Sequence, residues 1–125
     1  MKLADTDMVL LPGGLGGVHS ILASETAMNF IRLAYEKNCL IAAICAAPTI
    51  LAKLHITDGR KATCYPGLED QMGAAQMIPC GAVQDGNVIT GRAAGSADEF
   101  GLACLRALKG EDTARQVASD IVYRA

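Results

Sequence analysis

Short, continuous apolar runs along the chain are separated by stretches in which apolar residues recur at helical spacing. Met8 to Leu11 is an apolar run that ends in a Pro-Gly-Gly turn, which predicts a buried strand followed by a glycine-rich loop. Ser24 then precedes apolar positions at helical spacing as far as Lys37, so we expect a helix with Ser24 as its N-cap. Leu40 to Ile44 is a second apolar run and a second predicted strand.

The rest of the chain continues this alternation and adds a hairpin. Asp85-Gly86-Asn87 between two short runs is a strong hairpin signal. Ser96 and Glu99 have the spacing of a capping box, which predicts a helix that ends before Gly110. The other predicted elements are a helix over Pro48 to Leu54, a strand over Lys61 to Cys64, irregular chain with one helical turn over Gly67 to Met77, hairpin strands over Ala82 to Gln84 and Val88 to Thr90, and a last helix over Thr113 to Tyr123.

This order of elements predicts the fold class. Strands that alternate with helices need crossover connections, which give a mainly parallel sheet with helices on both faces. We therefore predict a single α/β domain over residues 1–125, with a doubly wound, mainly parallel sheet and a β-hairpin insertion. The first predicted strand is as apolar as a central strand although it lies close to Met1. We expect from this that its neighbours in the sheet are missing, as in an N-terminally truncated domain.

Composition and charge restrict the partners and the cellular location that we expect for the protein. Hydrophobic residues make up 51% of the chain and the formal net charge is -2, so neither nucleic acid nor a membrane surface is expected as a partner. The N-terminus has no signal-peptide pattern, and the longest apolar stretch, Leu40 to Leu54, is shorter than the ~20 residues of a membrane span. Five cysteines without a CxxC pair or zinc spacing predict reduced thiols, no metal site and a cytoplasmic location.

Cys45 is the strongest chemical candidate in the sequence. It follows the second predicted strand, precedes a helix and has small neighbours in Ala-Ile-Cys-Ala-Ala-Pro, which is the pattern of a nucleophile on a tight strand-to-helix turn. The amide groups of the following helix would stabilise the thiolate, the reactive form of cysteine. The alternative is a buried cysteine that acts as a small hydrophobic residue.

The glycine-rich loop lies at the same edge of the predicted sheet as Cys45. It lacks the Lys-Ser/Thr of a P-loop and the spaced glycines of a dinucleotide site, so it does not predict phosphate binding. Gly13 and Gly14 either form a plain turn or bring a backbone amide close to charge that develops near Cys45.

The two histidines and the remaining cysteines are weaker candidates. His19 is either a pocket residue or a solvated loop residue, and His55 is expected to cap the end of its helix. Cys64 and Tyr65 either face the site edge or pack in the core. The other cysteines, Cys39, Cys80 and Cys104, are expected to be core or surface thiols.

The segments VLLPGG, LIAAICAAP, TCYP and ITGRAAGSADEFGLA resemble the ThiJ/PfpI superfamily, in the branch of the parkinsonism-associated protein deglycase and its YajL-like bacterial relatives. The resemblance covers essentially the whole chain. It implies a flavodoxin-like sandwich, a homodimer, and a cysteine that oxidises readily to sulfinic acid. By position, it makes Cys45 the nucleophile, Gly14 and Ala46 the oxyanion-binding amides, Gly13 the residue that shapes the loop, and Tyr65 and Pro66 residues of the pocket.

Two departures from the family pattern stand out. Many members place a histidine near the thiol, and this chain has Tyr65 at the matching position. An aromatic residue there also occurs in YajL-like relatives, so we interpret it as a feature of that branch. The family also has a preceding segment that bears the first strands and a glutamate bonded to the cysteine, and this chain has no counterpart for it. We expect a truncated chain, a start codon assigned too late, or a site completed by another chain segment.

The resemblance implies a cofactor-independent, cysteine-dependent glyoxalase or deglycase. Its substrates would be methylglyoxal or another small aldehyde or dicarbonyl, or glycated proteins and nucleotides. The alternative hypothesis is a redox-sensing, chaperone-like stress protein in which the oxidation state of Cys45 is the signal. A glutamine amidotransferase ranks third, because it needs histidine and glutamate partners that this sequence does not supply.

Overall fold

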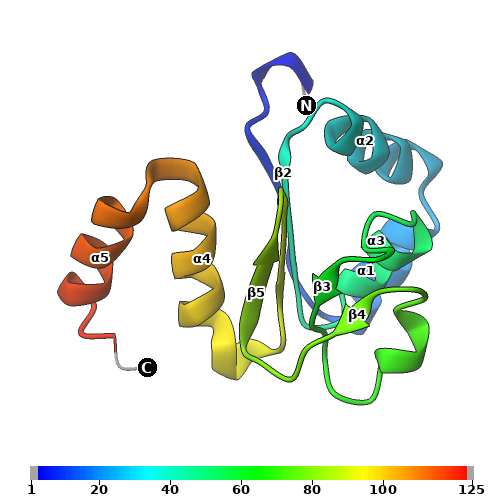
Figure 1. Ribbon diagram of the computed structural model, residues 1–125. Coiled ribbons are helices and arrows are strands. Elements are labelled where there is room, and N and C mark those ends of the chain that lie inside the picture. Colours follow the sequence, from blue (N-terminus) through cyan, green and yellow to red (C-terminus); the bar gives the residue numbers. More distant parts are fainter. Residues whose placement is uncertain (1–2, 124–125) are drawn as a thin grey trace.

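The structure, a computed structural model, describes residues 3–123 and has a four-stranded sheet between two layers of helices (Figure 1). The strands lie in the order β1-β2-β6-β5; β1, β2 and β6 are parallel, and β5 is antiparallel to β6. Their bounds are β1 Met8–Leu11, β2 Leu40–Ile44, β5 Ala82–Asp85 and β6 Val88–Gly91. The predicted doubly wound, mainly parallel sheet with a hairpin is confirmed.

Helices cover both faces of this sheet (Figure 1). Three lie on one face, α4 lies on the other, and α5 packs against α4. The helices are α1 Leu15–Leu22, α2 Glu25–Glu36, α3 Pro48–Lys53, α4 Ala97–Lys109 and α5 Glu111–Asp120, with short 3-10 turns at Leu3–Asp5, Glu69–Gln71 and Ala94–Ser96. Within residues 3–123, none of these helices combines the length and the apolar character needed to cross a bilayer.

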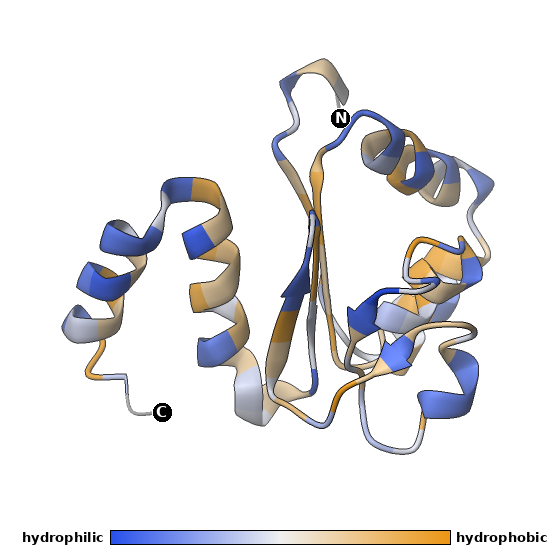
Figure 2. Cartoon of the chain, in the orientation of Figure 1, coloured by the Kyte–Doolittle hydropathy of each residue, from blue (hydrophilic) through white to orange (hydrophobic). Residues whose placement is uncertain are grey.

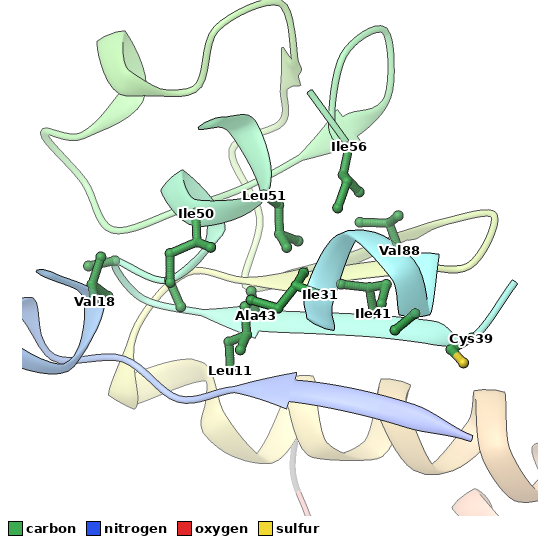
Figure 3. Packing of buried hydrophobic residues seen from close by; sticks show 13 residues of the cluster. Leu11, Val18, Ile31, Cys39, Ile41, Ala43, Ile50, Leu51, Ile56 and Val88 are labelled. Carbon is green, nitrogen blue, oxygen red and sulfur yellow. The ribbon is translucent and has the colours of Figure 1, made fainter. Parts of the chain in front are cut away.

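The hydrophobic core divides according to the alternation of side chains along β2. Ile41 and Ala43 face α1 to α3, whereas Ala42 faces α4, and all three are fully buried. Figure 3 shows the larger cluster between the sheet and the first three helices. In Figure 2 the hydrophobic colour follows β2 and α3, while α5 is largely hydrophilic. The central strand is thus buried on both sides, as expected for a parallel sheet.

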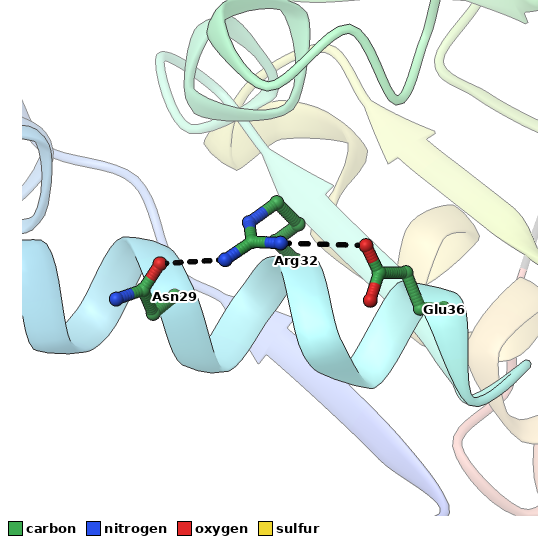
Figure 4. A network of polar contacts seen from close by, with 3 residues as sticks. All are labelled: Asn29, Arg32 and Glu36. Carbon is green, nitrogen blue, oxygen red and sulfur yellow. Dashed lines mark hydrogen bonds and ion pairs between the residues drawn. The ribbon is translucent and has the colours of Figure 1, made fainter.

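Helix α2 shows how local sequence positions one of these layers. The hydroxyl of Ser24 accepts a hydrogen bond from Ala27 N at 3.2 Å, so the predicted N-cap is confirmed. On the solvent side, Arg32 donates to Asn29 at 2.9 Å and to Glu36 at 3.4 Å (Figure 4). Exposed pairs of this kind contribute little to stability, so burial of the opposite, apolar face holds the helix in place.

Helix α1 lies where the sequence predicted only a glycine-rich loop, and that prediction was wrong. Leu15, Val18 and Leu22 recur at helical spacing. Val18 is 98% buried in the core between the helix and the sheet. Glycine in a helix interior costs roughly 1 kcal/mol relative to alanine. Burial of Val18 and packing of Ile21 against the same core outweigh the cost of the two internal glycines, because most helical stability in proteins comes from tertiary packing.

The third predicted strand, Lys61 to Cys64, is also not part of the main sheet. Only β3 (Lys61–Ala62) forms, and it pairs with β4 (Gln76–Met77) in a separate two-stranded sheet. The amide of Lys61 donates to the Asp85 carboxylate at 2.8 Å, and that of Thr63 donates to Thr90 Oγ1 at 3.0 Å. Side chains of the main sheet therefore hold this segment without extending the strand ladder. Gly67 to Met77 is irregular with one helical turn, as predicted, until β4 begins.

The predicted capping box of α4 does not form. Ser96 makes no capping hydrogen bond with its side chain; its hydroxyl and the carboxylate of Glu99 both lie against Gly81. The predicted end of the helix at Gly110 is confirmed, with a φ of 94° that suits glycine.

Helix α5 begins and ends earlier than the predicted span of Thr113 to Tyr123. Gly110 serves as the C-cap of α4 and the N-cap of α5. Glu111 then pairs with Arg106 and Arg115, and its charge suits a helix N-terminus. These contacts start the helix at Glu111.

Candidate functional site

Cys45 forms the turn between β2 and α3 in the left-handed region of backbone conformation, with a φ of 67°. This conformation costs a residue with a side chain roughly 1 kcal/mol or more. Two backbone hydrogen bonds hold the turn: Cys45 N donates to Gly91 O at 3.0 Å, and Tyr65 N donates to Cys45 O at 2.8 Å. The end of β6 and the segment after β3 thus fix the strained strand-to-helix turn that the sequence predicted.

Small, buried residues connect this turn to α3. Ala46 is 3% exposed and Ala47 is fully buried. Ala47 N donates to Ile44 O at 3.1 Å, and Thr49 Oγ1 donates to Ala46 O at 2.7 Å. Helix α3 has only six residues, so the amides nearest to Cys45 matter more than the dipole of the whole helix.

Gly13, at the end of the β1 segment, lies directly against Cys45. A Cβ atom at position 13 would stand 2.5 Å from the Cβ of Cys45 and 3.2 Å from its Sγ. Because real Cβ atoms do not approach other atoms so closely, any side chain at position 13 would displace the thiol. Gly13 therefore shapes the back of the site.

Gly14 begins helix α1 beside the same thiol. Its φ is 102°, and it precedes the helix as an N-cap residue without a capping side chain. The first N–H groups of a helix have no partner within the helix. Backbone donors of α1 therefore lie at this end of the site, where they can interact with a developing negative charge.

These elements enclose a pocket of about 340 Å³ beside Cys45. This volume suits a small ligand. Its walls are mainly apolar, and Tyr65 is 48% exposed. The lining residues are Gly14, Leu15, Cys45, Ala46, Tyr65, Pro66, Gly67 and Leu68. The thiol thus faces a small cavity made largely of backbone and aliphatic groups.

Neither histidine reaches this pocket. His19 lies on α1 with an exposed side chain and is not among the lining residues. His55 lies just after the C-cap residue of α3 with a φ of 63°, and its Nδ1 lies 2.9 Å from Asp58 Oδ2. No lining residue is a histidine or a carboxylate. In residues 3–123, no group of three His, Cys, Asp or Glu side chains is placed to hold a metal ion.

The other cysteines have environments unlike that of Cys45. Burial, followed by Glu69 and Asp70, raises the pKa of Cys64 to about 11, and burial raises the pKa of Cys104 to about 11. Burial and Glu99 raise the pKa of Cys80. The Sγ of Cys39 is 3.3 Å from Thr6 O. All five cysteines are free thiols.

The structure brings together most of the residues predicted for the site. Cys45, Gly14, Ala46, Tyr65 and Pro66 line one pocket, and Gly13 lies behind the sulfur. His19 does not join them. Sequence reasoning missed Leu15, Gly67 and Leu68; the helical spacing of Leu15 and the turn signal Pro66-Gly67 could have indicated them.

A larger groove of about 1070 Å³ follows the outer edge of β1 and lies apart from Cys45. It is lined by β1 and by residues of α2 and α4, and Leu10 in it is 49% exposed. In the described chain no strand pairs with this edge of β1. The groove contains no thiol and no histidine, so the smaller pocket is the candidate site.

Comparisons with known proteins identify the family of the chain. The sequence model of the DJ-1/PfpI family matches residues 1–107. The chain is 38% identical to Protein dj-1beta of Drosophila melanogaster over 118 residues, which cover 93% of the chain and 63% of that protein. It is 36% identical to the Parkinson disease protein 7 homolog of Danio rerio, covering 98% of the chain and 67% of that protein.

Solved structures show the same fold. The crystal structure of Drosophila melanogaster DJ-1beta matches with a TM-score of 0.88 at 36% identity, over 98% of this chain and 68% of that chain. An oxidised Toxoplasma gondii DJ-1 matches with a TM-score of 0.88 at 27% identity, with the same coverage. The chain thus spans about two thirds of the length of these relatives. It belongs to the DJ-1/PfpI family.

Proposed function

We propose that this chain carries the nucleophile of a cofactor-independent, glyoxalase- or deglycase-like enzyme that acts on methylglyoxal or on glycated proteins and nucleotides. The observation that supports this most directly is Cys45 on its strained turn, facing a small pocket with Gly13 against the sulfur. Membership of the DJ-1/PfpI family supports a stress-response or deglycase-like role. The pocket volume of about 340 Å³ is ample for a three-carbon dicarbonyl.

The proposed reaction begins when the thiolate of Cys45 adds to the aldehyde carbon, which forms a C–S bond and a hemithioacetal. Backbone donors at Gly14 and Ala46 bind the oxygen that becomes negative. A proton then moves from the former aldehyde carbon to the neighbouring carbon through an enediol, which leaves a thioester and a hydroxyl group. Water attacks the thioester, the C–S bond breaks, and a hydroxy acid leaves with the thiol restored.

Proton transfer is the slow part of this proposal. No histidine or carboxylate lines the pocket, and positioned acid–base groups typically contribute ~100-fold or more to a rate. Water or the hydroxyl of Tyr65 is left to carry the proton. We therefore expect slow turnover from this chain, and faster turnover when a segment that supplies a carboxylate beside Cys45 is present.

The test measures metal-free consumption of methylglyoxal and formation of lactate. The Cys45→Ser variant should lose at least about 100-fold of the rate, because it lacks the thiolate. Cys80→Ser is the matched control, since Cys80 is also a partly exposed free thiol, and it should keep the full rate. A Cys45→Ser variant as active as the original chain would remove Cys45 from the mechanism.

A second candidate function is a redox-responsive stress protein with chaperone-like action, in which oxidation of Cys45 is the signal. One structural relative, from Toxoplasma gondii, is described as oxidised, and Cys45 faces a pocket while Cys39, Cys64 and Cys104 are buried. Treatment with peroxide followed by peptide mass analysis tests this candidate. Oxidation of other cysteines with Cys45 still a thiol would exclude it.

A further inference from the structure

Cys64 is a second thiol beside the turn, and the proposed reaction does not use it. The hydrogen bond from Tyr65 N to Cys45 O, 2.8 Å long, places the peptide between Cys64 and Tyr65 directly against Cys45. Standard backbone dimensions then limit the separation of the Cα atoms of Cys45 and Cys64 to about 7.5 Å at most. A disulfide spans Cα separations up to about 7 Å, so the backbone separation is compatible with one when the Cys64 side chain turns toward Cys45.

The two thiols line neighbouring pockets that share one wall. Cys45 lines the pocket of about 340 Å³, Cys64 lines a neighbouring pocket of about 300 Å³, and Pro66 lines both. The Sγ of Cys64 makes a contact of 3.4 Å with Tyr65 O, which is a weak S–H interaction. Its other neighbours in the core are apolar: Ala52, Ala62 and Met72. Rotation of the Cys64 side chain thus breaks no strong bond.

The two thiols differ in how a small oxidant meets them. Cys45 faces the open pocket, whereas Cys64 is 3% exposed. Burial, Glu69, Asp70 and the nearby Cys45 raise the pKa of Cys64, so Cys64 stays protonated at neutral pH and is a poor first target. Thiol reactivity follows thiolate character and exposure.

The geometry points to Cys64 as the resolving thiol of an oxidised Cys45. A hydroperoxide reacts first: the sulfur of Cys45 takes one peroxide oxygen, the O–O bond breaks, and an alcohol or water leaves. The sulfur of Cys64 then attacks the sulfenic acid on Cys45, the S–O bond breaks, and water leaves with the thiol proton. The product is an intramolecular disulfide that a thiol reductant reverses, in place of sulfinic acid. This inference shares with the proposed function only the reactivity of Cys45.

The test treats the full chain with hydrogen peroxide and follows intact mass and peptides mapped without reduction. The expected product has lost about 2 Da, carries a Cys45–Cys64 peptide and returns to the starting mass with dithiothreitol. Cys64→Ser should instead gain about 32 Da at Cys45, as sulfinic acid. Cys104→Ser is the matched control, because Cys104 is equally buried and its pKa is also raised to about 11; it should still form the disulfide.

Contrary outcomes separate this inference from the proposed function. Direct conversion of Cys45 to sulfinic acid in the peroxide-treated original chain, with methylglyoxal consumed by the untreated chain, would overturn the inference alone. A disulfide at Cys45 that persists in Cys64→Ser would overturn the assignment to Cys64. A Cys45 that reacts with neither peroxide nor methylglyoxal would overturn both. Because the peptide map of the original chain already decides the first outcome, a poorly folded Cys64→Ser variant does not block the test.

Discussion

Cys45 and Cys104 are free thiols of the same small domain, but they lie in different backbone conformations. Cys104 lies within the regular helix α4, 5% exposed, where it packs with Ala42, Ile89 and Phe100. Cys45 lies on a turn with a φ of 67° and faces a pocket. Burial raises the pKa of Cys104, which suits a hydrophobic role. The comparison teaches that the local backbone, more than the residue type, decides which cysteine is available for chemistry.

The substitution with the largest expected effect on the difference between Cys45 and Cys104 is Gly13→Ala. The added Cβ would stand 2.5 Å from the Cβ of Cys45, so the thiol must move, and a displacement of about 1 Å can cost ~100-fold in rate. We expect a loss of that order in methylglyoxal consumption and in alkylation of Cys45 by iodoacetamide. Gly17→Ala is the control, because nothing lies within 4 Å of its Cβ position, and it should keep the rate. Equal rates in both variants would contradict the proposed role of Gly13.

Gly91 lies between the Cys45 turn and helix α4, which contains Cys104, so Gly91→Ala should disturb both regions. Its carbonyl accepts the hydrogen bond from Cys45 N, and a Cβ there would meet Phe100 of α4 at 2.8 Å and Ile44 at 2.9 Å. Overpacking of this kind typically costs about 1–3 kcal/mol. Urea denaturation measures the loss, and Gly95→Ala, whose Cβ position is open, should leave the midpoint nearly unchanged.

The core thiols should make stability fall at high pH. The pKa of Cys104 is about 11 in the fold against 9.0 for an ordinary thiol, so between these pH values the unfolded chain releases a proton that the folded chain keeps. The contribution of the protonated thiol to the free energy of unfolding is therefore fully present below pH 9 and is lost as the pH rises toward 11. We expect Cys104→Ala to reduce this fall by roughly 2 kcal/mol. Denaturation at pH 7 to 8 is the internal reference, because the thiol makes no pH-dependent contribution there.

The smallest expected effect separates strain from chemistry at position 45. Cys45→Ala keeps a Cβ at a φ of 67°, whereas Cys45→Gly removes it, so the glycine variant should be as stable or more stable, by up to about 1 kcal/mol. In the regular helix α5, Ala118→Gly should do the opposite and cost about 1 kcal/mol. Thermal denaturation of the three variants checks this, and an alanine variant more stable than the glycine variant would argue against strain.

The parts of the fold that the sequence predicted well are those with a single strong local signal. Continuous apolar runs located β1 and β2, and Asp85-Gly86-Asn87 located the hairpin. Helix α1 escaped prediction because its glycines have low helix propensity and its stability comes from packing. The segment after Lys61 was assigned to the main sheet because its residues favour strands, while side chains of Asp85 and Thr90 that bind its amides are remote in sequence.

The candidate site shows the same division. Cys45 was predicted from its neighbours in sequence, since a buried strand, small residues and a proline surround it. Leu68 and Leu15 were not predicted as site residues, because single apolar residues carry no chemical pattern and only the fold brings them to the thiol. For His19 the sequence left a pocket residue and a solvated residue as alternatives, and the choice between them depends on the direction of helix α1, which was not predicted.

The walls around Cys45 consist largely of main chain and of Gly13, Gly14 and Ala46. Main-chain groups recognise a carbonyl oxygen without regard to what else the molecule carries, so the proposed function assigns substrate selectivity to the side chains of Leu15, Tyr65 and Leu68 in the pocket lining. Under the proposed function, a variant meant for a bulkier aldehyde should therefore have smaller side chains at these three positions and keep Gly13, Gly14 and Ala46.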